Sequence, residues 1–271
     1  MKRILLAIIA VALLAAVAAY FLLSRSAGIP VYGTRIVATL PHDPQAFTEG
    51  LFFQNGALYE STGEIGSSSV RKVRPETGAI EQSVDLASPY FGEGIIGWKD
   101  RIYQLTWQNK TGFTYGLSDF ALRDTFAYEG EGWGLTQNGK NIIMSDGTST
   151  LRFLDPETMK PVSMLKVTAN GCPVDKLNEL EWVDGMILAN IWQTNLIARI
   201  DPASGKVASF LDVGALGPKN RDIDDVPNGI AYDGTAKRLF VTGKRWPQLY
   251  QVEQGDKVDS EAAKTLERCA N

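Results

Sequence analysis

The chain has 271 residues, 44% of them hydrophobic, which is enough for one large domain or two small ones. Its formal net charge is −4 and its charges are scattered, so no basic patch favours nucleic acid as a partner. Two cysteines, Cys172 and Cys269, allow at most one internal disulfide. We favour two free thiols over that bridge, because Cys269 lies in a polar C-terminal tail, residues 255–271.

Residues 1–25 predict a signal peptide or a membrane anchor. Lys2 and Arg3 precede an unbroken apolar stretch, residues 4–23, which is long enough to span a bilayer as an uncleaved anchor. The Ala-rich segment 15–19 leaves cleavage as the alternative. With the two basic residues held inside, either outcome exports the rest of the chain to a periplasmic or other extracytoplasmic space. Contact with the membrane is then limited to residues 4–23, if they stay attached.

The chain from residue 35 to about residue 252 has an all-β pattern. Short segments rich in Val, Ile, Tyr, Phe and Leu alternate with Gly, Asp, Asn and Pro turns, and no long amphipathic helix interrupts them. Five segments align as FTEGLFF, FGEGIIG, EGWGLTQ, LNELEWV and PNGIAYD, at spacings of 40 to 49 residues. A second marker, the turn at Arg74, Ser118, Asp155 and Asp201, recurs once in each of the first four repeats.

A repeat of about 45 residues with about four strands is typical of one blade of a β-propeller. The five repeats therefore predict a five-bladed β-propeller over residues 34–254. The segment RIVATLPH, near the start of this range, resembles the outermost strands of the other repeats, whereas the fifth repeat fades after PQLYQVE. We expect this N-terminal strand to complete the last blade and remove an open sheet edge.

The propeller geometry places Glu93, from the segment FGEGI, at the mouth of the central channel. Its flanking glycines, Gly92 and Gly94, let neighbouring backbones approach and leave the carboxylate uncovered. Other polar residues and indoles reach the same mouth from the remaining repeats: Glu49, Asn178, Glu179, Asp225, Asn228, Trp107, Gln108, Trp133, Trp192, Gln193, Lys244 and Trp246. Such a cavity suits a small polar substrate, and a carboxylate in this drier place holds its proton more readily.

Several chemistries lack the residues that they need. His42 is the only histidine, and no GxSxG motif accompanies it, so a serine hydrolase triad is not favoured. One histidine and two separated cysteines do not supply a catalytic zinc site. The glycines of GEGIIG lead into a strand, whereas a dinucleotide-binding motif needs a helix at that point.

Eight short motifs occur in a specific order: HDPQAFTEGL, FGEGI, LTWQ, EGWGLT, LNELE, ANIWQT, PNGIA and GKRWP. Together they resemble the plant and bacterial type of glutaminyl cyclase, the glutaminyl-peptide cyclotransferases, over roughly residues 34–252. This resemblance implies a five-bladed propeller that is unrelated to the zinc-dependent animal cyclases. It implies that the α-amine of an N-terminal glutamine attacks its own side-chain carboxamide, which releases ammonia and leaves pyroglutamate.

The resemblance also implies roles for individual residues. Glu93 matches the carboxylate that binds the α-amine, takes its proton and delivers one to ammonia. Asn178 and Lys244 match positions that hold the side-chain amide and stabilise the charge on its oxygen. We expect the substrate-binding set to be Glu49, Trp107, Gln108, Trp133, Trp192 and Asn228. The partners are peptides or proteins with N-terminal Gln, the enzyme is expected to be a monomer, and catalysis needs no cofactor, although a structural Ca²⁺ in the channel stays open.

Glu49 departs from the plant pattern, because this chain has FTEGL where plant members have FTQGL. A second carboxylate beside Glu93 would raise one of the two pKa values by mutual repulsion. Such a pair would assist proton shuttling or would only alter the pH optimum, and the sequence does not separate these outcomes.

Simpler interpretations exist for these residues. Glu93 would be structural if it accepted backbone N–H groups from adjacent blades, and without the resemblance this role would be favoured. Trp98, Trp182 and Trp246 are interpreted as packing residues and His42 as a turn residue.

Two other functions stay open: a Ca²⁺-dependent lactonase or related hydrolase, and a noncatalytic propeller that binds peptides.

Overall fold

The computed structural model describes residues 28–219 and 222–269. The predicted export segment, residues 1–25, lies outside the described residues. Within the described part of the chain, no helix is long and apolar enough to cross a membrane.

The described chain is almost entirely β-structure. Its elements are, in order, β1 (Val31–Pro41), β2 (Thr48–Gln54), β3 (Ala57–Thr62), β4 (Ser69–Arg74), β5 (Ala79–Asp85), β6 (Gly92–Trp98), β7 (Arg101–Thr106), β8 (Thr111–Gly116), β9 (Leu122–Ala127), β10 (Leu135–Gln137), β11 (Ile142–Met144), β12 (Thr150–Leu154), β13 (Pro161–Lys166), β14 (Thr168–Ala169), β15 (Cys172–Pro173), β16 (Leu177–Val183), β17 (Met186–Ile191), β18 (Leu196–Ile200), β19 (Val207–Asp212), β20 (Pro227–Asp233), β21 (Arg238–Gly243), β22 (Gln248–Lys257) and the helix α2 (Glu261–Leu266).

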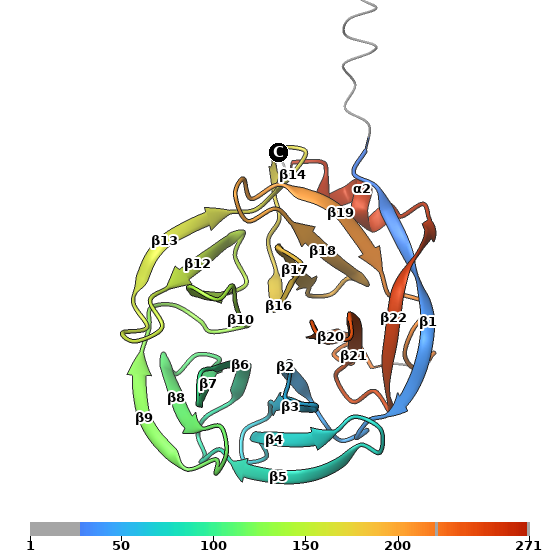
Figure 1. The fold of residues 1–271 in the computed structure, drawn as a ribbon. Coiled ribbons are helices and arrows are strands. Elements are labelled where there is room, and N and C mark those ends of the chain that lie inside the picture. The colour runs from blue at the N-terminus through green and yellow to red at the C-terminus, as the bar shows by residue number, and fades with distance from the viewer. Residues whose placement is uncertain (1–27, 220–221, 270–271) are drawn as a thin grey trace, which may run out of the picture.

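The sheets are arranged radially around one centre, as in a β-propeller (Figure 1). Three sheets have four strands each: β2–β5, β6–β9 and β10–β13. An eight-stranded sheet has the order β16-β17-β18-β19-β1-β22-β21-β20, and β14 and β15 form a small hairpin. The inner strands contact one another in a closed ring, β2 to β6, β10, β16, β20 and back to β2. The prediction of an all-β chain is confirmed.

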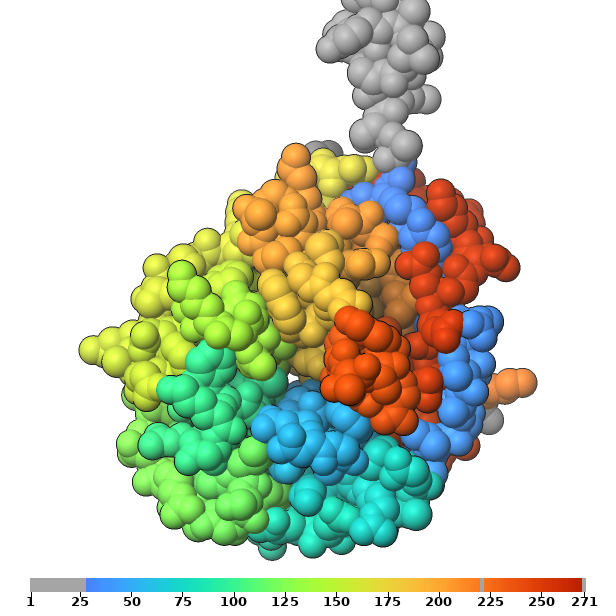
Figure 2. Space-filling model, viewed as in Figure 1, coloured from blue at the N-terminus to red at the C-terminus, as the bar shows by residue number. Residues whose placement is uncertain are grey.

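Strand β1 closes the ring, as the sequence predicts. It pairs antiparallel with β22, from Tyr32 opposite Lys257 to Pro41 opposite Gln248. Its first residues also pair parallel with β19, starting at Val31 opposite Phe210, which joins the two halves of the eight-stranded sheet. The ends of the described chain therefore lie side by side in the space-filling view, where blue meets red (Figure 2). This pairing covers edges that would otherwise be open to other chains.

Burial follows the distance of a strand from the centre. The first five residues of β2 and the first six of β6 are all buried, whereas β5 and β13 on the rim are largely exposed. An inner strand lies between two neighbouring sheets, so both of its faces are covered.

Glycines allow the inner strands to come close together. The Gly94 backbone N–H donates to the Trp133 carbonyl of the next sheet at 2.6 Å. A Cβ atom built on Gly94 would lie 2.5 Å from that carbonyl oxygen and 2.7 Å from the Gly134 backbone. Gly50 makes the equivalent approach, since its Cβ would lie 2.6 Å from the Ile95 nitrogen. The expected function of these glycines, close approach of neighbouring backbones, is confirmed.

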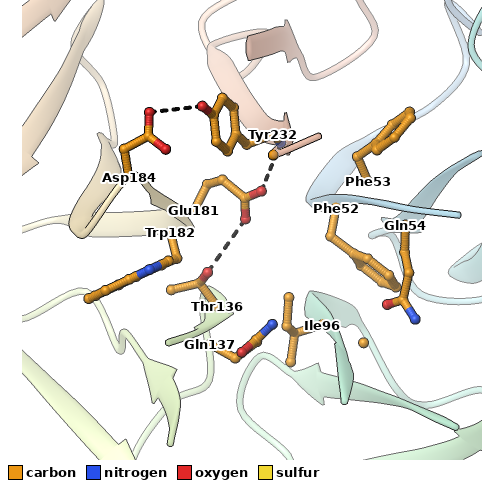
Figure 3. A pocket seen from close by; sticks show the side chains of 12 residues that line it. Phe52, Phe53, Gln54, Ile96, Thr136, Gln137, Glu181, Trp182, Asp184 and Tyr232 are labelled. Atoms are coloured by element: carbon orange, nitrogen blue, oxygen red, sulfur yellow. Dashed lines mark hydrogen bonds between the residues drawn. The ribbon is translucent and has the colours of Figure 1, made fainter. Parts of the chain in front are cut away.

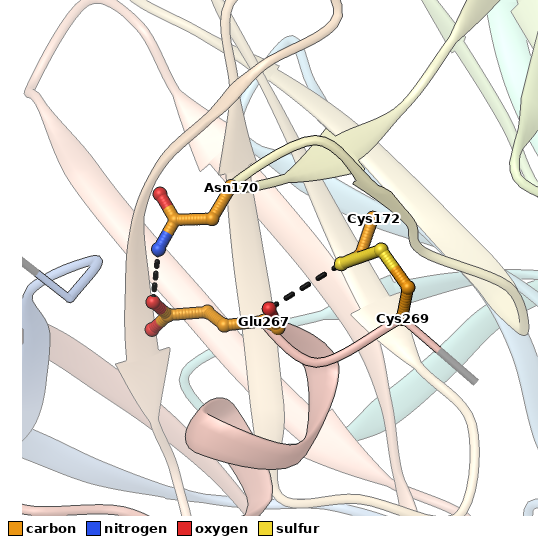
Figure 4. The surroundings of a disulfide bond; sticks show 4 residues. All are labelled: Asn170, Cys172, Glu267 and Cys269. Carbon is orange, nitrogen blue, oxygen red and sulfur yellow. Dashed lines mark hydrogen bonds between the residues drawn. A yellow bond between two sulfur atoms is a disulfide. The ribbon is translucent and has the colours of Figure 1, made fainter. Parts of the chain in front are cut away.

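The C-terminal tail is packed against the body of the molecule. Strand β22 continues to Lys257, and the short helix α2 is capped by Ser260 and buries Ala263. Cys269 forms a disulfide with Cys172 of β15 (Figure 4), so our interpretation of two free thiols is wrong. The tail is polar in composition, but its few apolar side chains join the core cluster around β16–β19, and this contact holds Cys269 near β15.

Glu267 strengthens the attachment of the tail. Its carboxylate accepts the backbone N–H of Ile29 at 3.0 Å and also the side-chain amide of Asn170 (Figure 4). The tail thereby connects the start of the described chain, the β14–β15 hairpin and the last strand.

Replacing Gly94 with Ala should destabilise the protein by about 2 kcal/mol or more, because the added methyl group forces two backbones apart. Gly234→Ala is the matched control, since a Cβ there would meet nothing closer than 3.9 Å and the backbone needs no left-handed conformation. Urea unfolding followed by tryptophan fluorescence measures both. Equal midpoints for the two variants would contradict the close approach.

Candidate active site

The strand pairing is irregular at the start of four inner strands, and these irregularities change the direction of candidate site side chains. The pairing register breaks between Thr48 and Gly50 in β2 and between Gly92 and Ile95 in β6. It breaks again between Leu177 and Leu180 in β16 and between Pro227 and Ile230 in β20. Each break lies at the start of an inner strand, and a bulge of this kind re-aims a side chain. Glu49, Glu93, Asn178 and Asn228 all lie in these breaks.

A cavity of about 260 Å³ lies at this end of the inner strands. Its lining is Phe47, Glu49, Phe91, Glu93, Trp107, Trp133, Asn178, Trp192, Asp224 and Lys244. Seven of these residues were predicted from the sequence to share one cavity, although they come from positions 49 to 244. The structure brings them together.

The Glu93 carboxylate is buried and open for a ligand. The residue is 6% exposed, and no described residue hydrogen-bonds its carboxylate. Burial raises its pKa well above the usual range, and the negative charges of Glu49 and Glu131 raise it further, against the opposing effect of Lys244. The alternative role of Glu93, as an acceptor of backbone N–H groups, is not what the structure shows.

Glu179 holds that structural role. Its carboxylate accepts the backbone N–H of Leu51 at 3.3 Å and that of Ile230 at 2.8 Å, so one side chain connects β16 to two other inner strands. It is fully buried, and burial raises its pKa well above the usual range. The sequence placed Glu179 and Glu93 in aligned positions, but only Glu93 faces the cavity.

Glu49 forms a buried ion pair with Lys244. The Lys244 Nζ lies 2.7 Å from Glu49 Oε1, and Asn228 Nδ2 donates to Glu49 Oε2 at 3.2 Å. Burial raises the pKa of Glu49, whereas Lys244 lowers it. The Lys244 Nζ also lies 4.5 Å from the centre of the Phe47 ring. Glu49 is close enough for its charge to raise the pKa of Glu93, as predicted for two neighbouring carboxylates.

Aromatic rings form the walls of the cavity in two groups. Phe91 makes edge contacts with Phe47 and Trp107, at centroid distances of 6.1 and 5.8 Å. On the other side, Trp133 and Trp192 meet at 5.7 Å with nearly perpendicular planes. Neither phenylalanine was predicted from the sequence. The signal was available, because each stands two positions before a cavity carboxylate, in FTE and in FGE.

Asn178 presents an unused acceptor at the cavity. Its side chain is buried, and its Oδ1 atom has no hydrogen-bond partner among the described residues. Its backbone carbonyl accepts the hydroxyl of Ser145 at 2.6 Å, which fixes this segment to the neighbouring sheet. A buried acceptor without a partner is costly, so this atom is suited to a ligand N–H group.

Comparison with known proteins agrees with this geometry. The model of the glutamine cyclotransferase family matches residues 5–254. The chain is 46% identical over 225 residues to a glutaminyl-peptide cyclotransferase of Arabidopsis thaliana. The matched segment covers 80% of this chain and 70% of the relative. The chain belongs to the glutamine cyclotransferase family. The resemblance inferred from the eight motifs is thus confirmed.

A solved member of this family has the same fold. The crystal structure of Myxococcus xanthus glutaminyl cyclase superposes with a TM-score of 0.79 and 35% identity, and the match covers 85% of this chain and 99% of that one.

Two residues of the predicted substrate-binding set do not line the cavity of this cyclotransferase-family chain. Gln108 is exposed, and its amide donates to Glu131 Oε1 at 3.2 Å. Asn228 is fully buried behind Glu49, where its amide also donates to the Thr48 carbonyl at 2.9 Å. Gln108 is next to Trp107 in the sequence, but its side chain is turned toward Glu131. Asp224 and Glu131 were not predicted from the sequence.

His42 has a structural environment, in agreement with its interpretation as a turn residue. Its Nδ1 lies 2.6 Å from the Trp246 carbonyl and its Nε2 lies 2.9 Å from Glu60 Oε1. Arg71 binds the other Glu60 oxygen at 2.6 Å, and although burial alone would raise the pKa of Glu60, its contacts with His42, Arg71 and the Thr48 hydroxyl lower it to about 2. This buried network fixes the connection between β1 and β2 beneath Glu49.

A second cavity, of about 330 Å³, lies at the opposite end of the inner strands (Figure 3). Glu181 is its buried carboxylate and accepts the Tyr232 backbone N–H at 2.8 Å and the Thr136 hydroxyl at 3.4 Å. Burial raises the pKa of Glu181 to about 8. None of the predicted site residues lines this cavity. Within residues 28–219 and 222–269, no cluster of three or more His, Cys, Asp or Glu side chains has a geometry that could hold a metal ion.

Proposed function

We propose that this chain converts the N-terminal glutamine of peptides or proteins to pyroglutamate and releases ammonia. The observation that carries the proposal is the buried Glu93 carboxylate, which has no hydrogen-bond partner among the described residues and faces a cavity lined by three indoles. Family membership supports the reaction class. The cavity, about 260 Å³, is at the small end of ligand pockets and suits one terminal residue of a longer chain.

The reaction needs only proton transfers within the site. The substrate α-amine nitrogen attacks the side-chain carbonyl carbon, a C–N bond forms, and Glu93 takes the proton that the amine loses. Glu93 then gives a proton to the carboxamide nitrogen, the C–NH₂ bond breaks, and ammonia leaves as the ring carbonyl re-forms. No water is consumed. A carboxylate with a raised pKa suits this double role, because it is a stronger base than an ordinary carboxylate and can still return the proton.

Lys244 and Asn178 are placed to assist the attack. Glu49 accepts one of the three ammonium N–H groups of Lys244, which leaves others to donate to the oxygen on which negative charge develops. The free Oδ1 of Asn178 is suited to accept an N–H of the substrate amine or carboxamide. The indoles exclude water and hold the glutamine side chain folded over its own amine, which lowers the entropic cost of ring closure.

The full-length chain in mild detergent should release ammonia from a Gln-initiated dipeptide and form its pyroglutamyl product. Glu93→Gln should lower kcat by at least about 100-fold, because the proton acceptor is lost. Glu76→Gln, at an exposed position, is the matched control and should be unchanged. Coupled ammonia detection and mass spectrometry of the peptide measure both products. Wild-type turnover in Glu93→Gln would remove this residue from the mechanism.

The same assay separates the other functions. We propose that turnover needs no metal, so a chelator should leave it unchanged. Loss of activity that Ca²⁺ restores would favour a metal-dependent hydrolase, and peptide binding without ammonia release would favour a noncatalytic propeller.

Glu49→Gln should move the acidic limb of the kcat profile to lower pH. The Glu49 charge raises the pKa of Glu93, so its removal lets Glu93 lose its proton at lower pH. Lys244 opposes that effect, so Lys244→Met should move the same limb to higher pH in its residual activity. A pH series from 4 to 10 with one peptide tests both variants. If the acidic limb moved in the same direction in Glu49→Gln and in Lys244→Met, the assignment of this limb to Glu93 would be refuted.

We also propose that the propeller has five blades and acts as a monomer. Its eight-stranded sheet divides at the parallel contact of β1 with β19 into two four-stranded blades, in support of the count. An experimental structure tests the count, and light scattering tests the monomer.

The domain is further proposed to function outside the cytoplasm, delivered by residues 1–25. The Cys172–Cys269 disulfide supports this, because such bonds persist in oxidising compartments. In whole cells, the thiols of the full chain should resist a maleimide until they are reduced, whereas a chain without residues 1–25 should react at once. Equal labelling of the two proteins would argue against export.

A further inference from the structure

Glu131 connects the two aromatic walls of the cavity, although it does not line the cavity. One of its carboxylate oxygens, Oε2, accepts the indole N–H of Trp107 at 2.8 Å and that of Trp133 at 2.9 Å. Its other oxygen accepts the Gln108 amide at 3.2 Å. Trp107 follows β7 and Trp133 precedes β10, so a single carboxylate bridges indoles from two neighbouring sheets.

The backbone around these indoles is already fixed by other bonds. The Gly132 N–H donates to the Trp107 carbonyl at 3.0 Å, and the Trp133 N–H donates to the Ser145 carbonyl at 3.1 Å. The freedom that remains is rotation of the indole rings. This freedom matters most for Trp107, which is 39% exposed and contacts Phe91 only at an edge. Glu131 supplies the contact that fixes both ring orientations.

We propose that Glu131 is a positioning residue of the cyclisation site, which locks the Trp107 and Trp133 indoles in the orientation that holds the folded glutamine. The proposal rests on the function proposed above. It is specific in its chemistry, because the two indole N–H donors need one shared oxygen acceptor at this point.

The charge of Glu131 has a second, separable effect. Glu131 is one of the groups that act on Glu93. Among residues 28–219 and 222–269, the titratable or charged groups that face Glu93 or line its cavity are Glu49 from β2, Lys244 after β21, Tyr128 and Glu131 before β10, and Asp224 before β20. Removal of the negative charge of Glu131 lets Glu93 lose its proton at lower pH, while the other groups stay in place.

Two substitutions separate position from charge. Glu131→Gln keeps a carbonyl oxygen that can accept both indole N–H groups but removes the charge, whereas Glu131→Ala removes both. Glu131→Ala should raise KM about tenfold, as expected from the loss of a hydrogen bond to a charged group, and Glu131→Gln should keep KM within about threefold of wild type. Both should move the acidic limb of the pH profile to lower pH. Glu129→Gln, two residues away and exposed, is the control for loss of charge.

A readout that does not depend on turnover keeps this test independent of the proposed function. Acrylamide quenching of tryptophan fluorescence should increase in Glu131→Ala and not in Glu131→Gln, and the increase should vanish when Trp107 is also replaced by Phe. Wild-type quenching and KM in a folded Glu131→Ala would overturn the proposal. If Glu131→Ala fails to fold, Glu131→Gln alone tests the proposal. A wild-type KM together with an acidic limb moved to lower pH would support the proposal, and a tenfold higher KM would overturn it. Absence of ammonia release by wild type, with the quenching pattern intact, would instead refute the proposed function alone.

Discussion

The close approach of the inner strands around the axis is the constraint on which the rest of the structure depends. Gly94 brings its backbone within hydrogen-bond distance of the Trp133 carbonyl, and Gly50 brings β2 equally close to β6. This approach leaves room near the axis for few side chains, and register breaks at the start of β2, β6, β16 and β20 direct side chains into the cavity or into the interior. A substitution that separates the strands would therefore disturb both stability and the site.

The buried carboxylates illustrate two solutions to the same electrostatic problem. Glu179 accepts backbone N–H groups from two other inner strands, so its carboxyl group serves the fold. Glu93 has no such donor in the described part of the chain and remains open to the cavity, where burial and neighbouring acids make its proton easier to keep. A fold that satisfied Glu93 in the same way as Glu179 would be more stable but would have no acceptor for a substrate proton. The cost of the open carboxylate is thus consistent with a functional site.

The surroundings of Glu93 are themselves supported from outside the cavity. Asn228 holds Glu49, Glu49 holds Lys244, and Glu131 holds two indoles, so three polar residues fix the side chains that a substrate would touch. Each of these supports crosses from one sheet to another. The cavity is therefore rigid only because the ring is closed, and the pairing of β1 with β22 at the rim contributes to the geometry at the centre.

The sequence by itself determined the repeat, the strand at which the ring closes, the family, and seven of the ten cavity residues, because these depend on local motifs and on periodicity. Tertiary structure alone decided which aligned acid faces the cavity, since Glu93 and Glu179 differ in the donors that other sheets supply. It also decided that Cys172 and Cys269 pair, through apolar contacts made by a tail that looks polar in composition. Glu131 was likewise invisible in the sequence, because its partners belong to two different sheets. The direction of a side chain at a bulge depends on packing, and so does each contact between distant segments. A short sequence motif does not contain this packing information.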